Sequence, residues 1–362
     1  MSTLKVNTIQ DTTGNDALTI DSSGNVTASQ GFVPSTQLSH RNLIINGAMQ
    51  VAQRGTSFTV GGLGVYTIDR FNLDESTDGS LTVSQSTEAP DNFKYSMKIT
   101  PASADTSIAS SQYARLKYFM EGNDVNHLGF GTSSAKDLTL SFYAKTNKTG
   151  TYCFSLDLLG GTERTYINEV SLTNTWTRYT LSIPKNTAQA FGNSTNGKSS
   201  ELQLVLAAGT DYNGTADDWT NTSFSTSNQV NFMDSTSNEL YITGVQLEVG
   251  SVATPFEHRS YGEELARCQR YYATSDGGYN LAVDIQDASF PSTNFPVTMR
   301  VSPTATVYTA NNGTINKMSR YAGISCTVSS VSTYPNGIRL IQHDSESNGQ
   351  SWAYRWTADA EL

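Results

Sequence analysis

The sequence predicts an all-β protein built on an antiparallel β-sandwich of the jelly-roll type, and three observations support this. Ser and Thr supply 90 of the 362 residues while only 15% are charged, a balance that favours short strands and polar turns over helices. Hydrophobic residues make up 37% of the chain, enough to fill buried cores at this length. Apolar and polar residues alternate along many short runs, as expected of strands covered on one face.

Composition also argues against several classes of partner. The net charge is −10 and Lys and Arg are not clustered, which disfavours binding to nucleic acid. The N-terminus is polar and no stretch of about 18 apolar residues occurs, so neither a signal peptide nor a membrane span is expected. Cys153, Cys268 and Cys326 are far apart and odd in number, which predicts buried thiols rather than a disulfide framework or a metal knuckle.

Residues 1–40 are expected to form a small separate β segment. Short apolar groups flank a turn at residues 21–25, a pattern typical of hairpin strands. The apolar side chains are few, and isolated hairpins are marginal in water. We therefore expect this segment to dock on another chain or to trimerise. Its apolar positions are Leu4, Val6, Ile9, Leu18, Ile20 and Val26.

Residues 41–259 carry about ten alternating runs separated by turn residues, the pattern of a sandwich or jelly roll. Each run places apolar side chains on one face and Ser, Thr or Lys on the other. The last strand of this domain is expected at Val245, Leu247 and Val249, after a separate run at Leu240 and Ile242. The other runs include Leu81/Val83, Met97/Ile99, Leu116/Tyr118/Met120, Leu138/Leu140/Phe142, Tyr152/Phe154/Leu156/Leu158, Tyr179/Leu181/Ile183 and Leu202/Leu204/Leu206.

Residues 260–274 predict one short helix that marks a domain boundary. Ser260 and Glu263 fit a capping box, in which the Ser hydroxyl accepts from a free backbone N–H and the Glu reaches back. Glu263 and Arg267 are four residues apart in the favourable order. Before the helix, Pro255 and Phe256 are expected to turn the chain away from the sandwich.

Residues 275–362 return to alternating runs and predict a second, smaller β domain. Its strands are expected at Leu281/Val283/Ile285, Val297/Met299/Val301, Ile324/Cys326/Val328, Ile338/Leu340 and Trp352/Tyr354/Trp356. Alternation places the rings of Trp352, Tyr354 and Trp356 on one face of the last strand. Two interpretations follow: the rings form the core or a subunit interface, or they form a platform on which a sugar stacks.

The stretch "GTDYNGTADDWTNTS" is a second candidate for ligand binding. Tyr212 and Trp219 lie among amides and carboxylates, a mixture suited to gripping carbohydrate; the alternative is that Trp219 pins a long loop to the sandwich. Asp211, Asp217 and Asp218 supply oxygens of the kind that bind Ca²⁺, and the alternative is a solvated loop. Calcium is the one cofactor that the sequence suggests.

The sequence contains none of the short motifs that commonly mark catalysis. It has no G-x-S-x-G elbow, no H-E-x-x-H and no phosphate-binding loop, and its four histidines are isolated from one another. We therefore expect no enzymatic activity and assign no catalytic residue.

Three motifs together resemble a recurring module of bacteriophage tail-fibre and virion-fibre proteins of the marine cyanophage type. They are "RNLIINGAMQVAQRGTSF", "YTIDRF" and "GVQLEVGSVATPFEHRSYGEELARCQRYY", and they bracket the predicted sandwich over about residues 40–275. "MSTLKVNTIQ" and "SGNVTASQGF" resemble the leader that attaches such proteins to the virion. "FPVTMRVSPTATV" resembles the opening of their C-terminal β domain.

The resemblance implies a homotrimer located in the virion and assembled in the cytoplasm of a host bacterium. It implies other virion proteins as partners through the N-terminal segment, and a jelly-roll domain likened to carbohydrate-binding modules. The first hypothesis is therefore a fibre in which the N-terminal segment is the anchor, the sandwich is the body and the C-terminal domain is the tip that meets the host surface, with multivalent weak binding to a glycan. The alternatives are a capsid or collar fibre with a mainly structural role, and a polysaccharide depolymerase.

Overall fold

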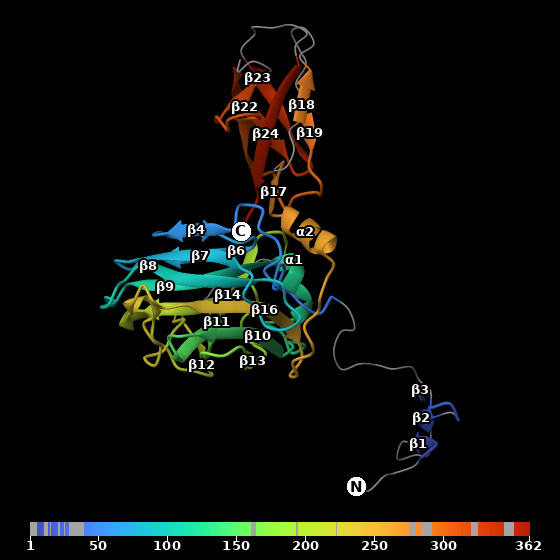
Figure 1. Cartoon of the computed structure of the whole chain (residues 1–362). Helices are drawn as coiled ribbons and strands as arrows, with labels where there is room; N and C mark the ends of the chain where they lie inside the picture. The colour runs from blue at the N-terminus through green and yellow to red at the C-terminus, as the bar shows by residue number, and fades with distance from the viewer. Residues whose placement is uncertain are drawn as a thin grey trace. The chain divides into compact units, whose positions relative to one another are not determined.

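The computed structural model separates the chain into two units, residues 1–41 and residues 42–362 (Figure 1). The residues it describes are 6–10, 14, 16–20, 22–24, 26–28, 40–160, 164–192, 195–221, 223–275, 280–283, 292–319, 325–343 and 351–362. Several predicted strand positions lie outside them: Leu4, Ile285, Ile324 and the side chains of Val26, Leu281, Val283, Cys326 and Leu340. No helix among the described residues is both long and apolar enough to cross a membrane.

The first unit is a three-stranded antiparallel sheet formed by β1 (Thr8–Gln10), β2 (Asp16–Ile20) and β3 (Val26–Ala28). Thr8 pairs with Thr19, and Ile20 pairs with Val26. None of the described side chains in this unit is buried, and Ile9 is 47% exposed. The sheet therefore has almost no core of its own, in agreement with the small number of apolar residues that form it.

The sandwich consists of thirteen strands. They are β4 (Ser57–Val60), β5 (Val65–Tyr66), β6 (Phe71–Glu75), β7 (Ser80–Ser86), β8 (Ser96–Ser103), β9 (Tyr113–Glu121), β10 (Leu138–Thr146), β11 (Gly150–Leu158), β12 (Arg164–Leu172), β13 (Thr177–Ile183), β14 (Lys198–Ala208), β15 (Trp219–Thr220) and β16 (Leu240–Val249). One sheet, here the β16 sheet, has the order β13-β10-β16-β8-β7-β4; the other, the β14 sheet, has the order β15-β12-β11-β14-β9-β6-β5.

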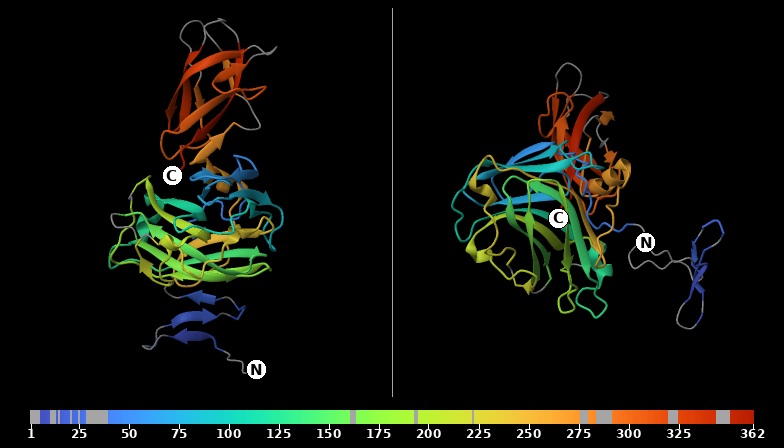
Figure 2. Two further views of the ribbon diagram at one scale, coloured as in Figure 1. Left: turned by 90° about the vertical axis from the view of Figure 1, so that its left-hand side faces the viewer. Right: turned by 60° about the horizontal axis from the view of Figure 1, so that its bottom comes forward.

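The two sheets pack face to face around one hydrophobic core (Figure 2). Phe142 of β10 stacks on Phe154 of β11 with 4.3 Å between ring centroids, so the sheets meet through large side chains. Short helical turns lie in the connections, namely α1 (Gly122–Val125), η1 (Asn126–Leu128), η2 (Thr210–Tyr212) and η3 (Phe232–Asp234). The prediction of an all-β chain built on a jelly-roll sandwich is confirmed.

The prediction of two separate strands at Leu240/Ile242 and Val245/Leu247/Val249 is wrong, because Leu240–Val249 is a single strand. A bulge at Gly244, where φ is +61°, shifts the register of β16 against β10. The extra residue changes which positions face inward, so Leu240 and Ile242 are buried before the bulge and Val245 and Leu247 after it. The buried apolar positions switch from even numbers (Leu240, Ile242) to odd numbers (Val245, Leu247), and this switch in the sequence indicates the bulge.

The segment that precedes the sandwich takes the place of a strand beside the second half of β16. Strand β8 pairs with β16 only from Leu240 to Ile242. Beyond that point Leu43 N–H donates to the carbonyl of Leu247 at 2.9 Å, and Val245 N–H donates to the carbonyl of Gly47 at 3.0 Å. The backbone of residues 42–47 thus continues the hydrogen bonding that β8 leaves open.

Polar side chains fix this segment, which we call the entry segment (residues 42–54). The Asn42 amide donates to the carbonyl of Val245 at 3.0 Å and accepts from Leu247 N–H at 3.1 Å. Arg259 donates to the backbone carbonyls of Asn42 and Ile44, and Glu264 accepts from Asn46 N–H. The motifs at the two ends of the sandwich therefore lie together and satisfy each other's buried polar groups.

A helix and a second β domain follow. Helix α2 (Tyr261–Gln269) begins at Ser260, whose hydroxyl accepts from Glu263 N–H at 3.3 Å, and Arg267 pairs with Glu263 at 3.0 Å. The predicted helix, the Ser260 cap and the ion pair are confirmed; the Glu263 carboxylate is directed to Arg267. The strands are β17 (Tyr272–Thr274), β18 (Asn280–Val283), β19 (Ser292–Asn294), β20 (Thr304–Thr309), β21 (Lys317–Ser319), β22 (Ser325–Tyr334), β23 (Gly337–His343) and β24 (Ser351–Asp359), and they enclose a core of their own.

A buried ion cluster joins the C-terminal residues to the sandwich. The fully buried Arg70 pairs with Glu361, lies 3.4 Å from the ring centroid of Tyr271, and donates to the carbonyl of Phe119 at 2.7 Å. Arg54 also pairs with Glu361, at 3.3 Å. Arg54 is also paired with Asp359, whereas the buried Arg70 has its ion pair with Glu361, so the Glu361 carboxylate is the anion that compensates Arg70.

Replacing Gly47 by Ala is expected to destabilise the 42–362 unit by about 3 kcal/mol. A Cβ at this position would overlap the carbonyl of Val245, which is held by the sheet. The free energy of unfolding measured in urea tests this. Gly62→Ala is the matched control, since a Cβ there meets no atom within 4 Å. Equal unfolding midpoints for the two variants would show that the entry segment can move away from β16.

Glu361→Gln is expected to lower the free energy of unfolding by about 3–5 kcal/mol, since it leaves Arg70 buried without its anion. The control is Asp359→Asn, which removes the 3.1 Å ion pair of a 46% exposed carboxylate with Arg54 and should cost about 1 kcal/mol or less. Chemical denaturation of both variants provides the measurement. A loss no greater for Glu361→Gln than for Asp359→Asn contradicts the assignment of Glu361 as the compensating anion.

Candidate functional site

The three rings predicted on the last strand lie inside the C-terminal domain. Trp352, Tyr354 and Trp356 are 3%, 1% and 3% exposed and belong to its hydrophobic core. Trp356 packs against Phe295 at 5.1 Å between ring centroids, and the Tyr354 hydroxyl bonds the hydroxyl of Thr293 at 2.5 Å. The interpretation as a sugar platform is therefore corrected: alternation gathers the rings on one face, and that face is the buried one.

Tyr212 and Trp219 are both packed against the sandwich. Tyr212 stacks on Phe224 at 4.6 Å and donates from its hydroxyl to the carbonyl of Ser111 at 2.9 Å. Trp219 contacts Tyr166 and Phe130 at 5.3 and 6.1 Å between ring centroids, and its indole nitrogen is buried. The structure thus favours the alternative in which these rings pin the loop, and it does not combine them into one open aromatic surface.

The three aspartates of the same loop do not form a metal site. Asp211 accepts from the Ser110 hydroxyl at 3.2 Å, Asp217 accepts from the Asn168 amide at 3.3 Å, and Asp218 accepts from Trp219 N–H at 2.8 Å. Within the described part of the chain, no group of three or more His, Cys, Asp or Glu side chains could hold a metal ion. The calcium hypothesis for these residues therefore stays a prediction that this arrangement does not support, because each carboxylate is directed to a different partner.

The outer face of the β14 sheet carries a charged network. Asp74 pairs with Lys117 at 2.5 Å and with Arg115 at 3.2 Å, and Arg115 also approaches Glu201 at 3.7 Å. Burial alone would raise the pKa of Asp74, but the hydrogen bond and charge of Lys117 lower it below its ordinary value. Because every charge has an opposite partner inside the network, the network stabilises the sheet without requiring a ligand.

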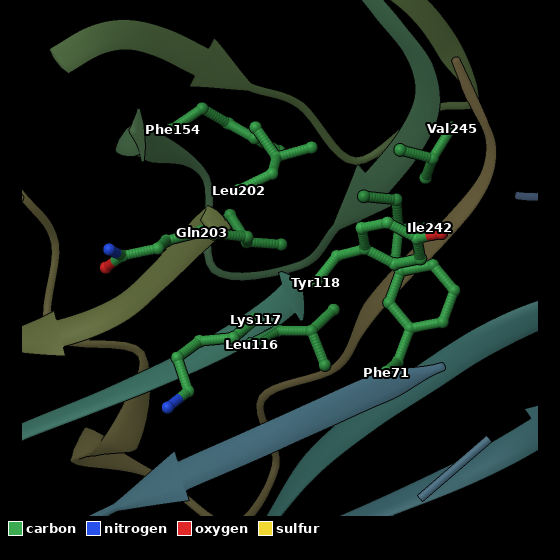
Figure 3. Close-up of a pocket in the computed structure, with 10 residues that line it drawn as sticks. Phe71, Leu116, Lys117, Tyr118, Phe154, Leu202, Gln203, Ile242 and Val245 are labelled. Atoms are coloured by element: carbon green, nitrogen blue, oxygen red, sulfur yellow. The ribbon is translucent and has the colours of Figure 1, made fainter. Parts of the chain in front are cut away.

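A small cavity lies between the two sheets, and its lining is almost entirely apolar (Figure 3). Its volume is about 20 Å³, room for about one water. In Figure 3 the side chains of Phe71, Tyr118 and Ile242 gather around it, whereas Lys117 points away to the opposite face of its strand. The cavity is a packing defect of the core and is too small for an organic ligand.

A larger cleft opens on the outer side of the β16 sheet, with a volume of about 550 Å³. It lies between Phe93 from the β7–β8 connection, Tyr143 of β10, and Phe256 and His258 from the segment after β16. The rings contact one another: Phe93 lies 5.3 Å from Tyr143, 5.1 Å from Phe256 and 5.2 Å from His258. We call this the aromatic cleft; its lining residues are Asp91, Asn92, Phe93, Tyr143, Arg178, Pro255, Phe256 and His258.

Polar groups border the rings of the aromatic cleft. Arg178 of β13 is fixed by hydrogen bonds to the Ser141 hydroxyl and to the carbonyl of Thr254. Asp91 and Asn92 are exposed on the opposite border. The volume lies in the range of small-ligand pockets, and the lining combines rings with a few polar groups.

The bulge of β16 makes room for this cleft. A Cβ at Gly244 would lie 2.7 Å from the Phe93 ring and 3.0 Å from the Tyr143 ring. A Cβ here would therefore force the two rings to shift, and the positive φ of the bulge independently favours glycine. The signal in the sequence was the change of apolar parity at Gly244, together with the Pro255-Phe256 corner.

A second cleft, with a volume of about 610 Å³, lies on the other side of the same connection. Phe93 lines the aromatic cleft, whereas the next two residues, Lys94 and Tyr95, line the second one. Tyr261, which is 55% exposed, borders it from the first turn of α2. We call this the Tyr261 cleft; its lining residues are Gln50, Ala52, Thr56, Gln85, Lys94, Tyr95 and Tyr261.

Trp356→Ala is expected to destabilise the C-terminal domain by about 3–5 kcal/mol, since it leaves a large cavity in the core. Ligand binding at the sandwich should be unchanged under conditions in which the variant is folded. Tyr334→Ala is the control, because that ring is 51% exposed. Thermal unfolding followed by near-ultraviolet circular dichroism tests both. A Trp356→Ala variant of normal stability that loses ligand binding would restore the platform interpretation.

Comparison with known proteins finds similarity in structure but not in sequence. No protein-family model matches the chain, and no curated protein matches it. A domain described as the enzymatically active domain of tailspike protein 4 of bacteriophage CBA120 is 11% identical, with a TM-score of 0.30. The match covers 57% of this chain and 21% of that one, so the chain spans about a fifth of the tailspike domain.

Two carbohydrate-binding modules are similar to the same extent. The family 11 module from Clostridium thermocellum is 9% identical, covering 55% of this chain and 98% of that one, with a TM-score of 0.30. A xylan-binding family 22 module from Paenibacillus barcinonensis is 10% identical, covering 61% and 100%, also with a TM-score of 0.30. Similarity at this level transfers no ligand, activity or assembly state to this chain.

Proposed function

We propose that this protein is a non-enzymatic fibre protein of a bacteriophage particle that adheres to a host-surface glycan through the aromatic cleft. The proposal has two parts with separate support. The aromatic cleft supports the glycan, and the sequence motifs that bracket the sandwich support the fibre.

The observation that carries the glycan part is the grouping of four rings beside Arg178, Asp91 and Asn92. Sugar rings present C–H faces that pack on aromatic rings and hydroxyl groups that need hydrogen-bond partners. The cleft offers both, because Phe93, Tyr143 and Phe256 are only partly buried and the exposed His258 completes the ring surface. Weak binding at one such site suits a fibre that presents several copies.

The fibre part rests on the motifs and on the contact between them. Residues 41–58 and 244–272 resemble phage fibre modules, and they are joined by hydrogen bonds between the side chains of Asn42, Arg259 and Glu264 and backbone groups of the other motif. Residues 1–40 would then bind other virion proteins and hold three copies together. The particle would be assembled in the cytoplasm of the host bacterium.

Two other functions belong to the same proposal as alternatives. A capsid or collar fibre would use the same fold with a mainly structural role, and labelling the protein on intact particles would distinguish it from a tail fibre. A polysaccharide depolymerase would need two facing carboxylates in a cleft. The linings of the aromatic cleft and the Tyr261 cleft together carry one carboxylate, Asp91, so we favour adhesion.

Phe256→Ala and His258→Ala are expected to weaken glycan binding at least about tenfold, because each removes a ring from the cleft. The measurement is binding of the full-length chain to immobilised oligosaccharides and to host cells. Val252→Ala is the control, since that side chain is 66% exposed and does not line the cleft. His258 is itself exposed, so its variant should fold normally. Unchanged binding by both folded ring variants would contradict the assignment of the cleft.

A further inference from the structure

The two clefts share their borders. The connection at residues 91–95 separates them, with Phe93 on one side and Lys94 and Tyr95 on the other. The segment at residues 255–261 borders both, through Phe256 and His258 in one and Tyr261 in the other. The ring contacts of Phe93 with Phe256 and His258 join the two borders. The two clefts are therefore neighbours, separated by this connection and by the rings that pack against it.

Each cleft contributes one cation. Arg178 is half-buried in the aromatic cleft, and Lys94 is exposed in the Tyr261 cleft. Neither forms an ion pair with any carboxylate among the residues that the structure describes, whereas Lys98 and Lys145 on the same sheet pair with Glu239 and Glu88. Asp91 is the single acidic residue in the two linings. Counting Asp91, the two linings together carry one net positive charge, on a chain whose net charge is −10.

The hydrogen bonds of Arg178 indicate which functional group of the ligand would bind there. Its Nη2 atom is held by the Ser141 hydroxyl and the carbonyl of Thr254, so the guanidinium has a fixed plane. Both Nη2 hydrogens are used in these bonds, so Nε and Nη1 are the donors left for a ligand, and a carboxylate oxygen accepts a charge-assisted hydrogen bond from such a donor. The aromatic rings beside it match the C–H face of the sugar that carries the carboxylate.

We infer that the ligand is an acidic polysaccharide, with a uronic-acid carboxylate at Arg178 and a second anionic group further along the chain at Lys94. This inference rests on the proposed glycan binding and specifies its chemical class. Two cations in separate clefts match a polysaccharide that carries one negative charge in each repeating unit. They do not fit nucleic acid, whose phosphate density would be repelled by the acidic protein.

The experiment uses the full-length chain and an array of immobilised oligosaccharides in which each neutral member is paired with its uronic-acid counterpart. We expect binding to the acidic members, and a loss of at least about tenfold in Arg178→Gln and a smaller loss in Lys94→Gln. Lys185→Gln is the matched control, because Lys185 is exposed and lines neither cleft. Binding should also weaken between low and high salt.

The results distinguish a failure of the acidic-ligand inference from a failure of the proposed glycan binding. Equal binding to neutral and acidic partners, or unchanged binding in Arg178→Gln and Lys94→Gln, overturns the inference and leaves glycan binding standing. Displacement of the acidic oligosaccharide by single-stranded DNA also overturns it. Binding to no member of the array contradicts the proposed function itself. Arg178→Lys keeps the charge but loses the bonds from Nη2 to Ser141 and Thr254, so a partial loss of binding there supports a carboxylate held at a guanidinium of fixed orientation.

Discussion

The arrangement of the sandwich, the helix and the C-terminal domain depends on the hydrogen bonds that the entry segment makes with β16. Strand β8 leaves β16 after Ile242, and an open strand edge in the middle of a sheet would bury unpaired backbone groups. The entry segment closes that edge, with the Asn42 side chain bonding both Val245 and Leu247. Arg259 then binds the entry segment, and this fixes the direction in which the chain leaves the sandwich toward α2.

Polar contacts also make the junction between the sandwich and the C-terminal domain. The guanidinium carbon of Arg70 lies 3.4 Å from the ring centroid of Tyr271 and 5.2 Å from that of Tyr118. The flat face of the guanidinium therefore packs on these rings as an apolar side chain would. Arg300 donates to the carbonyls of Ala360 and Glu361 and to that of Asn196 in the sandwich. Charged side chains therefore lie at the boundary between the two hydrophobic cores. Their hydrogen bonds are directional, so they favour one arrangement of the two domains over others that apolar packing alone would allow.

Local features were predictable from the sequence, whereas features that need distant contacts were not. The start of α2 followed from Ser260 and Glu263, because a helix cap is made by residues three apart. Alternation grouped Trp352, Tyr354 and Trp356 correctly on one face, but it cannot say which face of a strand is covered. The aromatic cleft was out of reach for a stronger reason: Phe93, Tyr143, Arg178 and Phe256 come from four segments that only the folded sheet order brings together.

The bulge at Gly244 connects the fold with the site, and this explains why the cleft lies where it does. Without the extra residue, Val245 and Leu247 would face outward, and the edge that the entry segment closes would not exist in this register. The bulge also removes the Cβ that would hold Phe93 and Tyr143 away from the strand. A single backbone irregularity therefore keeps the core packed on one face of β16 and makes room for rings on the other. The ring surface combines Tyr143 of the sheet with Phe93, Phe256 and His258 from the connections beside it, so the bulge and these two connections together shape the cleft.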